Sequence, residues 1–199
     1  MRLTLLRVQR WRCWNRSLVL REFSPRITLV VGPNGVGKST LVQALRFALF
    51  ESHRAGGQTV RAALLPWGDP FDSDGRVGPS VTIEFEHEGR RFRLRKRWLR
   101  RAESVLREWV GGRFVDVANG DEADERVRRW MLGTKPARGL SREAQWGLAR
   151  ILWTATQGAL DLRLDQATDQ PVLERIHQAL TVPLARDLSA LEREIVAEV

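Results

Sequence analysis

Three kinds of apolar spacing follow one another along the first fifty residues. Residues 2–8 and 17–23 are short segments of β-favouring composition, and residues 27–31 form a continuous apolar run, typical of a strand buried on both faces. The spacing that follows predicts a helix over residues 38–50. The apolar face of that helix comprises Leu41, Leu45, Ala48 and Leu49. This part of the chain is therefore predicted to contain three strands and one helix.

Strict alternation of apolar and polar residues marks the middle of the chain. Residues 81–97 alternate on both sides of Glu88-Gly89, which predicts a hairpin with a two-residue turn. The expected cross-strand pairs are Glu86 with Arg91, Glu84 with Arg93, Thr82 with Arg95 and Ser80 with Arg97. Arg95 and Arg97 then face uncharged residues only, which leaves that end of the polar face positively charged. A second hairpin around residues 111–112 completes a predicted meander of about four strands.

A loop precedes this meander and a series of helices follows it. Residues 52–80 are rich in Gly and Pro and predict a long loop with a short ordered piece at residues 60–65. Residues 121–132 predict an amphipathic helix, and Ser141 and Pro171 are suitable starts for two more. The last apolar positions have coiled-coil spacing, although an ordinary amphipathic helix gives the same signal over two heptads. They are Leu184, Leu188, Leu191 and Ile195.

Composition limits the class of protein and of partner. The chain has 199 residues, enough for one globular domain, and 33 basic against 24 acidic side chains give a net charge of +9. This excess favours an anionic partner, with nucleic acid first and nucleotide phosphate second. One cysteine, Cys13, permits no internal disulfide, and three isolated histidines give no zinc-ligand spacing. Without a signal peptide or a membrane-length apolar stretch, the sequence predicts a cytoplasmic protein with no membrane partner.

A phosphate-binding motif stands between the third predicted strand and the first predicted helix. Residues 32–40 read Gly-Pro-Asn-Gly-Val-Gly-Lys-Ser-Thr, a full match to the Walker A pattern. Glycines allow the backbone N–H groups to turn toward phosphates, Lys38 supplies a cation for the β- and γ-phosphates, and the Ser39 hydroxyl is the expected Mg²⁺ ligand. The alternative is a chance glycine-rich turn. The candidate nucleotide-binding residues here are Gly32, Asn34, Gly35, Val36, Gly37, Lys38, Ser39 and Thr40.

A second acidic motif, which a hydrolytic P-loop enzyme needs to hold magnesium and position water, is missing from the sequence. Neither Val115-Asp116 nor residues 162–165 provide an apolar strand that ends in Asp. No guanine-reading Asn-Lys-x-Asp motif is present either, which disfavours a GTPase. Three strands near the phosphate loop also cannot close a doubly wound domain. The sequence therefore predicts half of an NTPase domain.

A family resemblance supports this interpretation. Residues 8–12, 18–20, 27–40 and 44–50 look like the N-terminal lobe of ABC-type ATPase heads in the SMC and SbcC families, an AAA_23-like group that includes Rad-type DNA-repair ATPases. The Pro-Asn inside a phosphate loop so close to the chain start is the most specific feature. Residues 151–158 resemble the Q-loop of these heads, and a surface glutamine is the alternative interpretation of Gln157.

The resemblance implies a fold, cofactors and partners. The fold is an α/β P-loop NTPase half-domain with an antiparallel meander and helices that lead toward a coiled coil. Residues 1–180 would form the N-terminal head lobe, and residues 181–199 would begin the coiled coil or an exit helix. ATP and Mg²⁺ are the implied cofactors, with Ser39 and Gln157 at the metal, Arg12 near the phosphates and Asn34 near the γ-phosphate.

The resemblance also implies that catalysis depends on other polypeptide segments. A C-terminal lobe would supply the signature motif, the Walker B strand and the catalytic Glu, so no catalytic residue is expected in this chain. The implied assembly is a homodimer of heads that closes around ATP and acts on DNA in repair, chromosome organisation or anti-phage defence. A nuclease or accessory subunit is a further partner of such heads.

Two other protein classes are alternatives to the ATPase head, and the predicted DNA surface has one alternative interpretation. A small-molecule P-loop kinase suits the chain length but requires more parallel strands after the loop. A transporter-type ABC domain is disfavoured by the long separation of Lys38 from Gln157. For DNA, the candidate phosphate contacts are Arg95, Arg97, Arg100 and Arg101, and the alternative is a solvated strand face.

Overall fold

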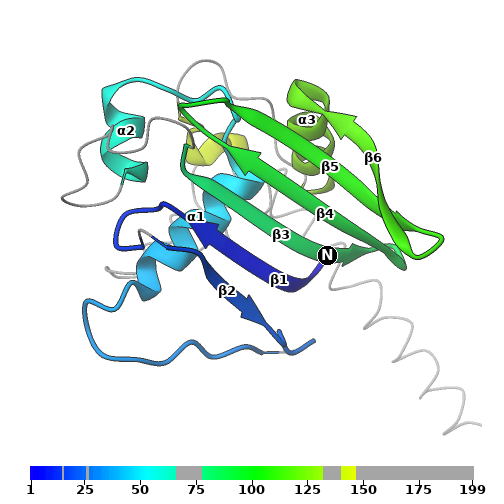
Figure 1. The fold of residues 1–199 in the computed structure, drawn as a ribbon, viewed down its shortest axis with the longest axis horizontal. Helices are drawn as coiled ribbons and strands as arrows, with labels where there is room; N and C mark the ends of the chain where they lie inside the picture. The colour runs from blue at the N-terminus through cyan, green and yellow to red at the C-terminus, as the bar shows by residue number, and fades with distance from the viewer. Residues whose placement is uncertain (15, 26, 66–77, 132–139, 147–199) are drawn as a thin grey trace, which may run out of the picture. The chain divides into compact units, whose positions relative to one another are not determined.

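The computed structural model describes residues 1–14, 16–25, 27–65, 78–131 and 140–146, which belong to one compact unit, Met1–Trp146. Its main element is a six-stranded sheet in the order β2-β1-β3-β4-β5-β6, in which every neighbouring pair is antiparallel (Figure 1). The strands are β1 (Arg2–Gln9), β2 (Leu18–Arg21), β3 (Ser80–His87), β4 (Arg90–Arg97), β5 (Glu103–Val110) and β6 (Arg113–Asn119). The α/β class expected from the sequence is confirmed.

The predicted meander is present with the predicted register. In the β3–β4 hairpin Glu84 is opposite Arg93 and Thr82 is opposite Arg95, as a two-residue turn at Glu88-Gly89 requires. The β5–β6 hairpin turns at Gly111-Gly112. Pairing of β1 with β3 was not predicted, and it joins the N-terminal strands and the meander into one continuous sheet.

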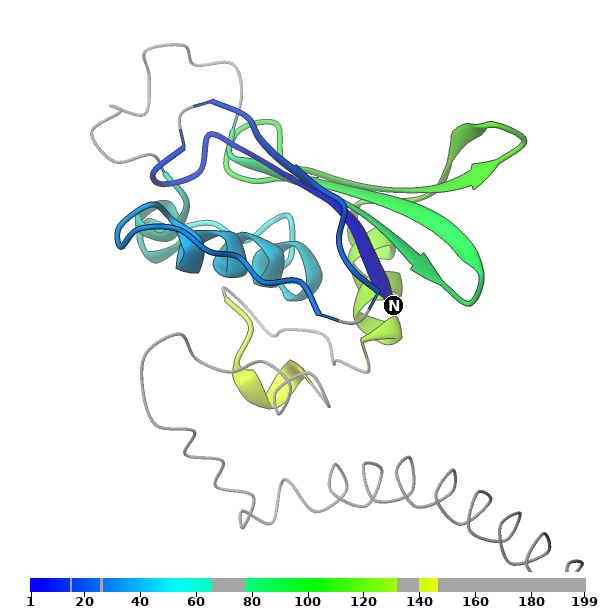
Figure 2. The same ribbon diagram turned by 90° about the horizontal axis from the view of Figure 1, so that it is seen from below.

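Two helices pack on one face of this sheet (Figure 2). They are α1 (Lys38–Phe50) and α3 (Gly120–Trp130), both close to their predicted bounds, while α2 (Gln58–Leu64) is the short ordered piece expected in the 52–80 segment. The core between sheet and helices is apolar and buried. It includes Leu6, Val8, Ile83, Leu94, Leu106, Phe47, Ala48 and Val127.

Three aromatic rings join the first strand, the first helix and the end of β4. Trp11 packs edge-on against Phe47 and Trp98, with ring centroids 5.3 and 5.5 Å apart. Phe47 and Trp98 also meet edge-on at 6.0 Å. All three rings are fully buried, and the Trp98 indole N–H donates to the backbone carbonyl of Ser52 at 2.9 Å. The segment after β1 is thereby fixed against α1, the helix that follows the phosphate loop.

Charged groups are buried on the helical side of the sheet. The Lys96 ammonium lies 2.9 Å from a carboxylate oxygen of Asp124, and neither side chain is more than 2% exposed. The other Asp124 oxygen accepts from the backbone N–H of His53 at 2.9 Å and lies 2.8 Å from its Nδ1. Burial alone raises the pKa of Asp124, but the Lys96 charge and the bonds to His53 lower it to about 2. Burial also lowers the pKa of Lys96, against the opposing effect of Asp124.

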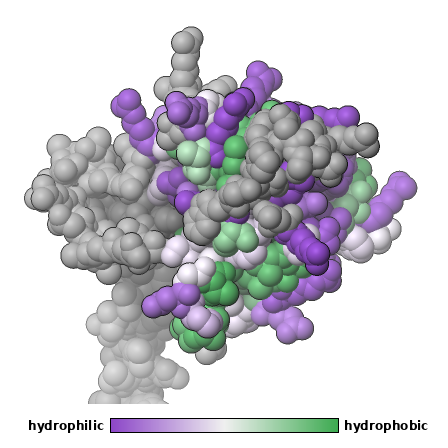
Figure 3. Space-filling view, turned by 60° about the vertical axis from the view of Figure 1, so that its left-hand side comes forward, coloured by the Kyte–Doolittle hydropathy of each residue, from purple (hydrophilic) through white to green (hydrophobic). Residues whose placement is uncertain are grey.

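The predicted buried strand over residues 27–31 is wrong for this structure. These residues form no strand, and Ile27, Leu29 and Val31 are 82%, 79% and 79% exposed. An apolar run becomes a strand only where a neighbouring strand satisfies its backbone and covers its side chains, and no described strand pairs with it. Figure 3 shows hydrophobic groups at the surface, among hydrophilic ones, on the side of the molecule that it draws.

The segment 140–146 continues the described part of the chain with a single 3₁₀ turn, η1 (Glu143–Trp146). Ser141 donates its hydroxyl proton to the Glu51 carboxylate at 2.7 Å, and most of the helix that it is predicted to start lies outside the described residues. The helices predicted beyond residue 146, including the coiled-coil positions, lie outside the described residues. Among the described helices, none combines the length and the apolar character needed to cross a membrane.

Candidate functional site

The predicted phosphate loop leads directly into α1, whose N-cap is Gly37. Gly35 and Gly37 have φ angles of 81° and 100°, in the left-handed region that side chains disfavour. Gly37 is the N-cap of α1, and no side chain caps the helix. The N–H groups of the first turn of α1 are therefore not claimed by a capping side chain, which is the arrangement that suits a phosphate group.

The Lys38 side chain reaches back to the first residues of the loop. Its ammonium donates to the carbonyl oxygens of Gly32 and Pro33, each at 2.7 Å. These two bonds bring the first residues of the loop and the first residue of α1 together around one positive charge. A phosphate bound in the loop would exchange these carbonyl partners for charged oxygens, which form stronger bonds with an ammonium.

A turn after β1 covers the start of α1. A Cβ placed on Gly37 would lie 2.6 Å from the Trp14 ring and 2.7 Å from the Cys13 sulfur, so a side chain has no room there. In the same turn, Arg12 donates from Nη1 to the side-chain oxygen of Gln43 at 3.1 Å. The structure thus brings Arg12 to α1, the helix that carries Lys38.

The remaining candidates of the nucleotide site differ in exposure. Asn34, Val36 and Ser39 are exposed, so their side chains are accessible to a ligand, whereas Thr40 is buried in the first turn of α1. Gln157, the second expected metal ligand, lies outside the described residues.

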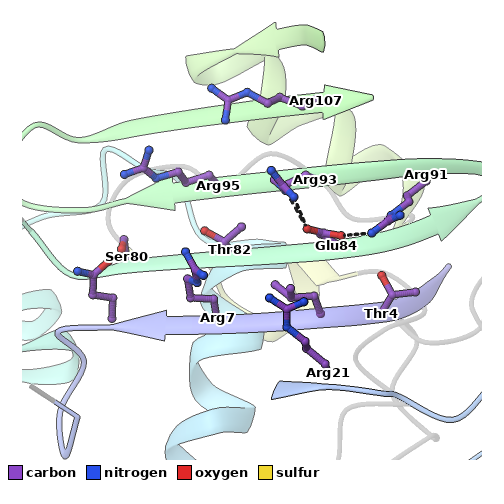
Figure 4. Close-up of a pocket in the computed structure, with 12 residues that line it drawn as sticks. Thr4, Arg7, Arg21, Ser80, Thr82, Glu84, Arg91, Arg93, Arg95 and Arg107 are labelled. Carbon is purple, nitrogen blue, oxygen red and sulfur yellow. Dashed lines mark hydrogen bonds and ion pairs between the residues drawn. The ribbon is translucent and has the colours of Figure 1, made fainter. Parts of the chain in front are cut away.

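The sheet face opposite α1 and α3 carries a second candidate site. It forms a concavity of about 570 Å³ to which β1, β2, β4 and β5 contribute arginines (Figure 4). These arginines are Arg7, Arg21, Arg91, Arg93, Arg95 and Arg107. We call this set of residues the arginine groove.

One carboxylate, Glu84, organises the centre of the arginine groove. It is bound by Arg91 at 2.6 Å and by Arg93 at 2.6 Å, as the dashed lines in Figure 4 mark. Burial raises the pKa of Glu84, but the hydrogen bonds and charges of the two arginines outweigh it, so the net pKa lies below its usual value. Glu84 is therefore ionised at neutral pH and fixes two guanidinium groups in place.

The charge expected at Arg95 and Arg97 needs a correction. Their β3 partners are Thr82 and Ser80 as predicted, but Glu103 on the other neighbouring strand, β5, lies 3.4 Å from Arg95 and 2.8 Å from Arg97. The sequence prediction was based on the β3–β4 hairpin and did not include β5, the other strand that pairs with β4. The Arg97 side chain is also only 12% exposed, so this end of the sheet is partly neutralised.

The other two predicted DNA contacts lie beyond β4. Arg101 is exposed, whereas Arg100 is half-buried and its backbone N–H donates to the Trp98 carbonyl at 2.9 Å. Neither is among the residues that line the arginine groove.

Sequence reasoning missed five of the six groove arginines as candidate contacts: Arg7, Arg21, Arg91, Arg93 and Arg107. The alternation of apolar and polar residues places Arg91 and Arg93 on the polar face of the predicted hairpin, so the sequence alone could have identified these two. Arg7 and Arg21 needed knowledge of the β1–β3 pairing, which joins strands more than seventy residues apart. Within the described part of the chain, these two arginines form no ion pair or hydrogen bond.

Comparison with known proteins gives a family match and matches to individual proteins. The family model for an AAA domain, AAA_23, matches residues 5–142. A chromosome segregation protein, sudA of Emericella nidulans, is 32% identical over 104 residues, which are 52% of this chain and 8% of that protein. A DNA double-strand break repair Rad50 ATPase of Nanoarchaeum equitans is 32% identical over 78 residues, which are 39% of this chain and 8% of its own length.

The chain thus spans less than a tenth of the curated relatives that it matches. Among solved structures, an SMC head domain from Thermotoga maritima aligns with 67% of this chain and 43% of its own, at 25% identity and a TM-score of 0.38.

Proposed function

Because the chain belongs to the AAA_23 family of AAA domains, we propose that it is the ATP-binding half of an SMC- or SbcC-like ATPase head that acts on DNA. Residues 32–40 would hold ATP, with backbone N–H groups and Lys38 on its phosphates. Ser39 and Gln157 would hold Mg²⁺, which neutralises phosphate charge and aligns the phosphates for attack when it is bound.

One observation carries the half-head proposal. The run Ile27–Val31 has the composition of a buried strand, lies just before the phosphate loop, and is exposed. Exposed apolar segments of this kind mark surfaces that another polypeptide covers. We assign this run to a C-terminal lobe, which would pair with it and bring the signature motif, the Walker B carboxylate and the catalytic Glu.

The same proposal explains the chemistry that this chain does by itself. Its own residues would bind and orient the phosphates through the loop and Lys38. The turn after β1, which contains Arg12, packs on the start of α1. A base that deprotonates the attacking water is not among the residues of the loop. Nucleotide binding without steady hydrolysis is therefore the expected behaviour of the chain alone, and closure of two heads around ATP would restore turnover.

The competing kinase proposal gains no support from the fold. A small-molecule P-loop kinase places further parallel strands after the loop, and the strands described after residue 38 are all antiparallel to their neighbours. The face of the sheet that carries the arginine groove is an extended basic surface, which suits a polyanion such as DNA.

Nucleotide titration of the Lys38→Ala variant tests the proposal. Calorimetry with Mg-ATP is expected to detect binding to the native chain and to detect at least a tenfold weaker binding to the variant, because the loop loses its phosphate cation. Arg54→Ala is the matched control, since it removes one exposed positive charge at the other end of α1. Steady ATP hydrolysis by the chain alone, abolished by Lys38→Ala, would contradict the half-head proposal.

A further inference from the structure

The arginine groove contains two cations that its own carboxylates do not neutralise. Arg21 on β2 pairs in register with Leu5, and Arg7 on β1 pairs with Val19, so the two arginines lie diagonally on the same face of neighbouring strands. Both are exposed, and neither has an ion pair or hydrogen bond among the described residues. Two guanidinium groups without counter-charges at one edge of a concavity provide donors for an anion.

The rest of the groove is held in place by ion pairs. Glu84 binds Arg91 and Arg93, Glu103 lies beside Arg95, and Asp116 binds Arg107 at 2.6 Å. Six guanidinium groups therefore share three carboxylates, and the groove keeps a net positive charge. Because each guanidinium has five N–H donors, a paired arginine still has donors to offer to a phosphate.

An aromatic pair, of which Trp109 is exposed and Phe114 is half-buried, extends the groove at its other end. Trp109 at the end of β5 is 42% exposed and packs edge-on against Phe114 of β6 at 4.8 Å. The Arg91 guanidinium carbon lies 5.4 Å from the centre of the Trp109 ring, and that of Arg93 lies 3.8 Å from the centre of the Phe114 ring. The cationic groove and the aromatic pair thus form one continuous surface.

We propose that this surface, from Arg7 and Arg21 to Trp109, binds single-stranded nucleic acid. Phosphates would lie along the arginines, and an unpaired base would stack on Trp109. Four strand spacings separate β2 from β5, a span of roughly 19 Å, which several nucleotides can cover. Base stacking on an exposed ring beside arginines is the mode by which proteins hold single strands, whereas a duplex keeps its base faces inside the stack. The inference rests on the proposed action on DNA and assigns to it a strand preference.

Fluorescence anisotropy with the full chain tests this assignment, using a labelled oligothymidine and a duplex of the same length. The double variant Arg7→Glu, Arg21→Glu is expected to weaken oligothymidine binding at least tenfold and to lower the slope of log K against log salt by about 1.4, from the loss of two phosphate contacts. Trp109→Ala should weaken oligothymidine binding about tenfold, the range of one lost base stack, and leave duplex binding unchanged.

Matched variants separate a site from general charge. Arg54→Glu with Arg129→Glu makes the same charge change away from the groove, since Arg129 lies on α3, and is expected to retain binding. Arg7→Lys with Arg21→Lys should restore most of the affinity, and Trp109→Phe should keep the stacking. An equal loss in the Arg54, Arg129 variant would overturn the proposal, because charge alone would then explain the affinity.

The outcomes also separate this inference from the proposed function. Duplex binding at least as tight as oligothymidine binding, with no loss of oligothymidine binding in Trp109→Ala, would overturn the single-strand preference and leave the action on DNA intact. Absence of binding to either nucleic acid, in a chain that still binds Mg-ATP, would overturn the inference and the DNA part of the proposed function while the nucleotide site stands.

Discussion

The carboxylate of Glu51 receives two hydrogen bonds from Ser141, one from its backbone N–H at 2.6 Å and one from its hydroxyl at 2.7 Å. Glu51 directly follows α1 and is fully buried. The indole N–H of Trp146 donates to the same hydroxyl at 2.8 Å, and its ring stacks on Phe50 at 5.2 Å. The C-terminal end of the helix that begins at the phosphate loop is thereby fixed to the segment 140–146.

Removal of the Glu51 carboxylate should destabilise the protein. Glu51→Ala leaves the Ser141 N–H and hydroxyl without their acceptor, at a cost of about 1–3 kcal/mol in the free energy of unfolding. Urea unfolding measures this loss, with the exposed Glu122→Ala as the control. In a double-mutant cycle with Ser141→Ala, which removes the hydroxyl bond and keeps the backbone one, the two changes should be partly non-additive. Additive losses would mean that Glu51 acts through other contacts.

The buried Lys96–Asp124 pair gives a second stability prediction. Lys96→Met leaves the Asp124 charge buried without its cation, which should lower the free energy of unfolding by about 3–5 kcal/mol. Combining Lys96→Met with Asp124→Leu removes both charges and should recover part of that loss, although His53 then loses its partner. Urea denaturation of the native protein, the single variant and the double variant measures the order of their free energies of unfolding. A single variant as stable as the native protein would show that the pair contributes no net stability.

Acid should weaken the fold through the same carboxylate. The pKa of Asp124 is about 2 in the folded protein against its usual 3.8, so the folded state favours the ionised form. The resulting stability is present above about pH 4 and is lost as the pH falls toward 2, with a magnitude of about 2 kcal/mol. The groups that face Asp124 are Lys96, His53 and Arg128.

Comparison of urea midpoints at about pH 5 and about pH 2.5 tests this dependence. The native protein should lose more stability over this interval than the Asp124→Asn variant, which has no carboxylate to protonate. Asp116→Asn, at an exposed carboxylate, is the control and should behave as the native protein does. Equal losses in the native and Asp124→Asn proteins would contradict the prediction.

Local sequence signals predicted the local parts of this structure. The alternation around Glu88-Gly89 determined the β3–β4 register because a two-residue turn leaves one pairing, and helical spacing located α1. Contacts between distant segments were not accessible in the same way. The β1–β3 pairing, the Glu103 partner of two arginines and the burial of Lys96 all depend on strands that meet only in the folded sheet. The same limit explains why residues 27–31 were expected to be buried.

Gly37 should not tolerate a side chain. Gly37→Ala places a Cβ at a φ of 100° and within 2.7 Å of Cys13 and Trp14, so the loop or the covering turn must shift. We expect at least a tenfold loss of Mg-ATP affinity, measured by calorimetry. Gly112→Ala is the control, since its φ is 85° but nothing lies within 4 Å of the added Cβ. It should cost about 1–2 kcal/mol in stability and leave ATP affinity unchanged.

The exposed apolar run before the phosphate loop should bind a hydrophobic probe. Leu29→Asp with Val31→Asp is expected to lower the fluorescence of the dye ANS in the presence of the chain and to reduce its self-association, seen by light scattering. The free energy of unfolding should change by less than about 0.5 kcal/mol, because both residues are 79% exposed. Val115→Asp, at an exposed apolar residue of β6, provides the control. A large loss of stability with unchanged ANS fluorescence would instead mean that the run is buried within this chain, and the assignment of a covering lobe would fail with it.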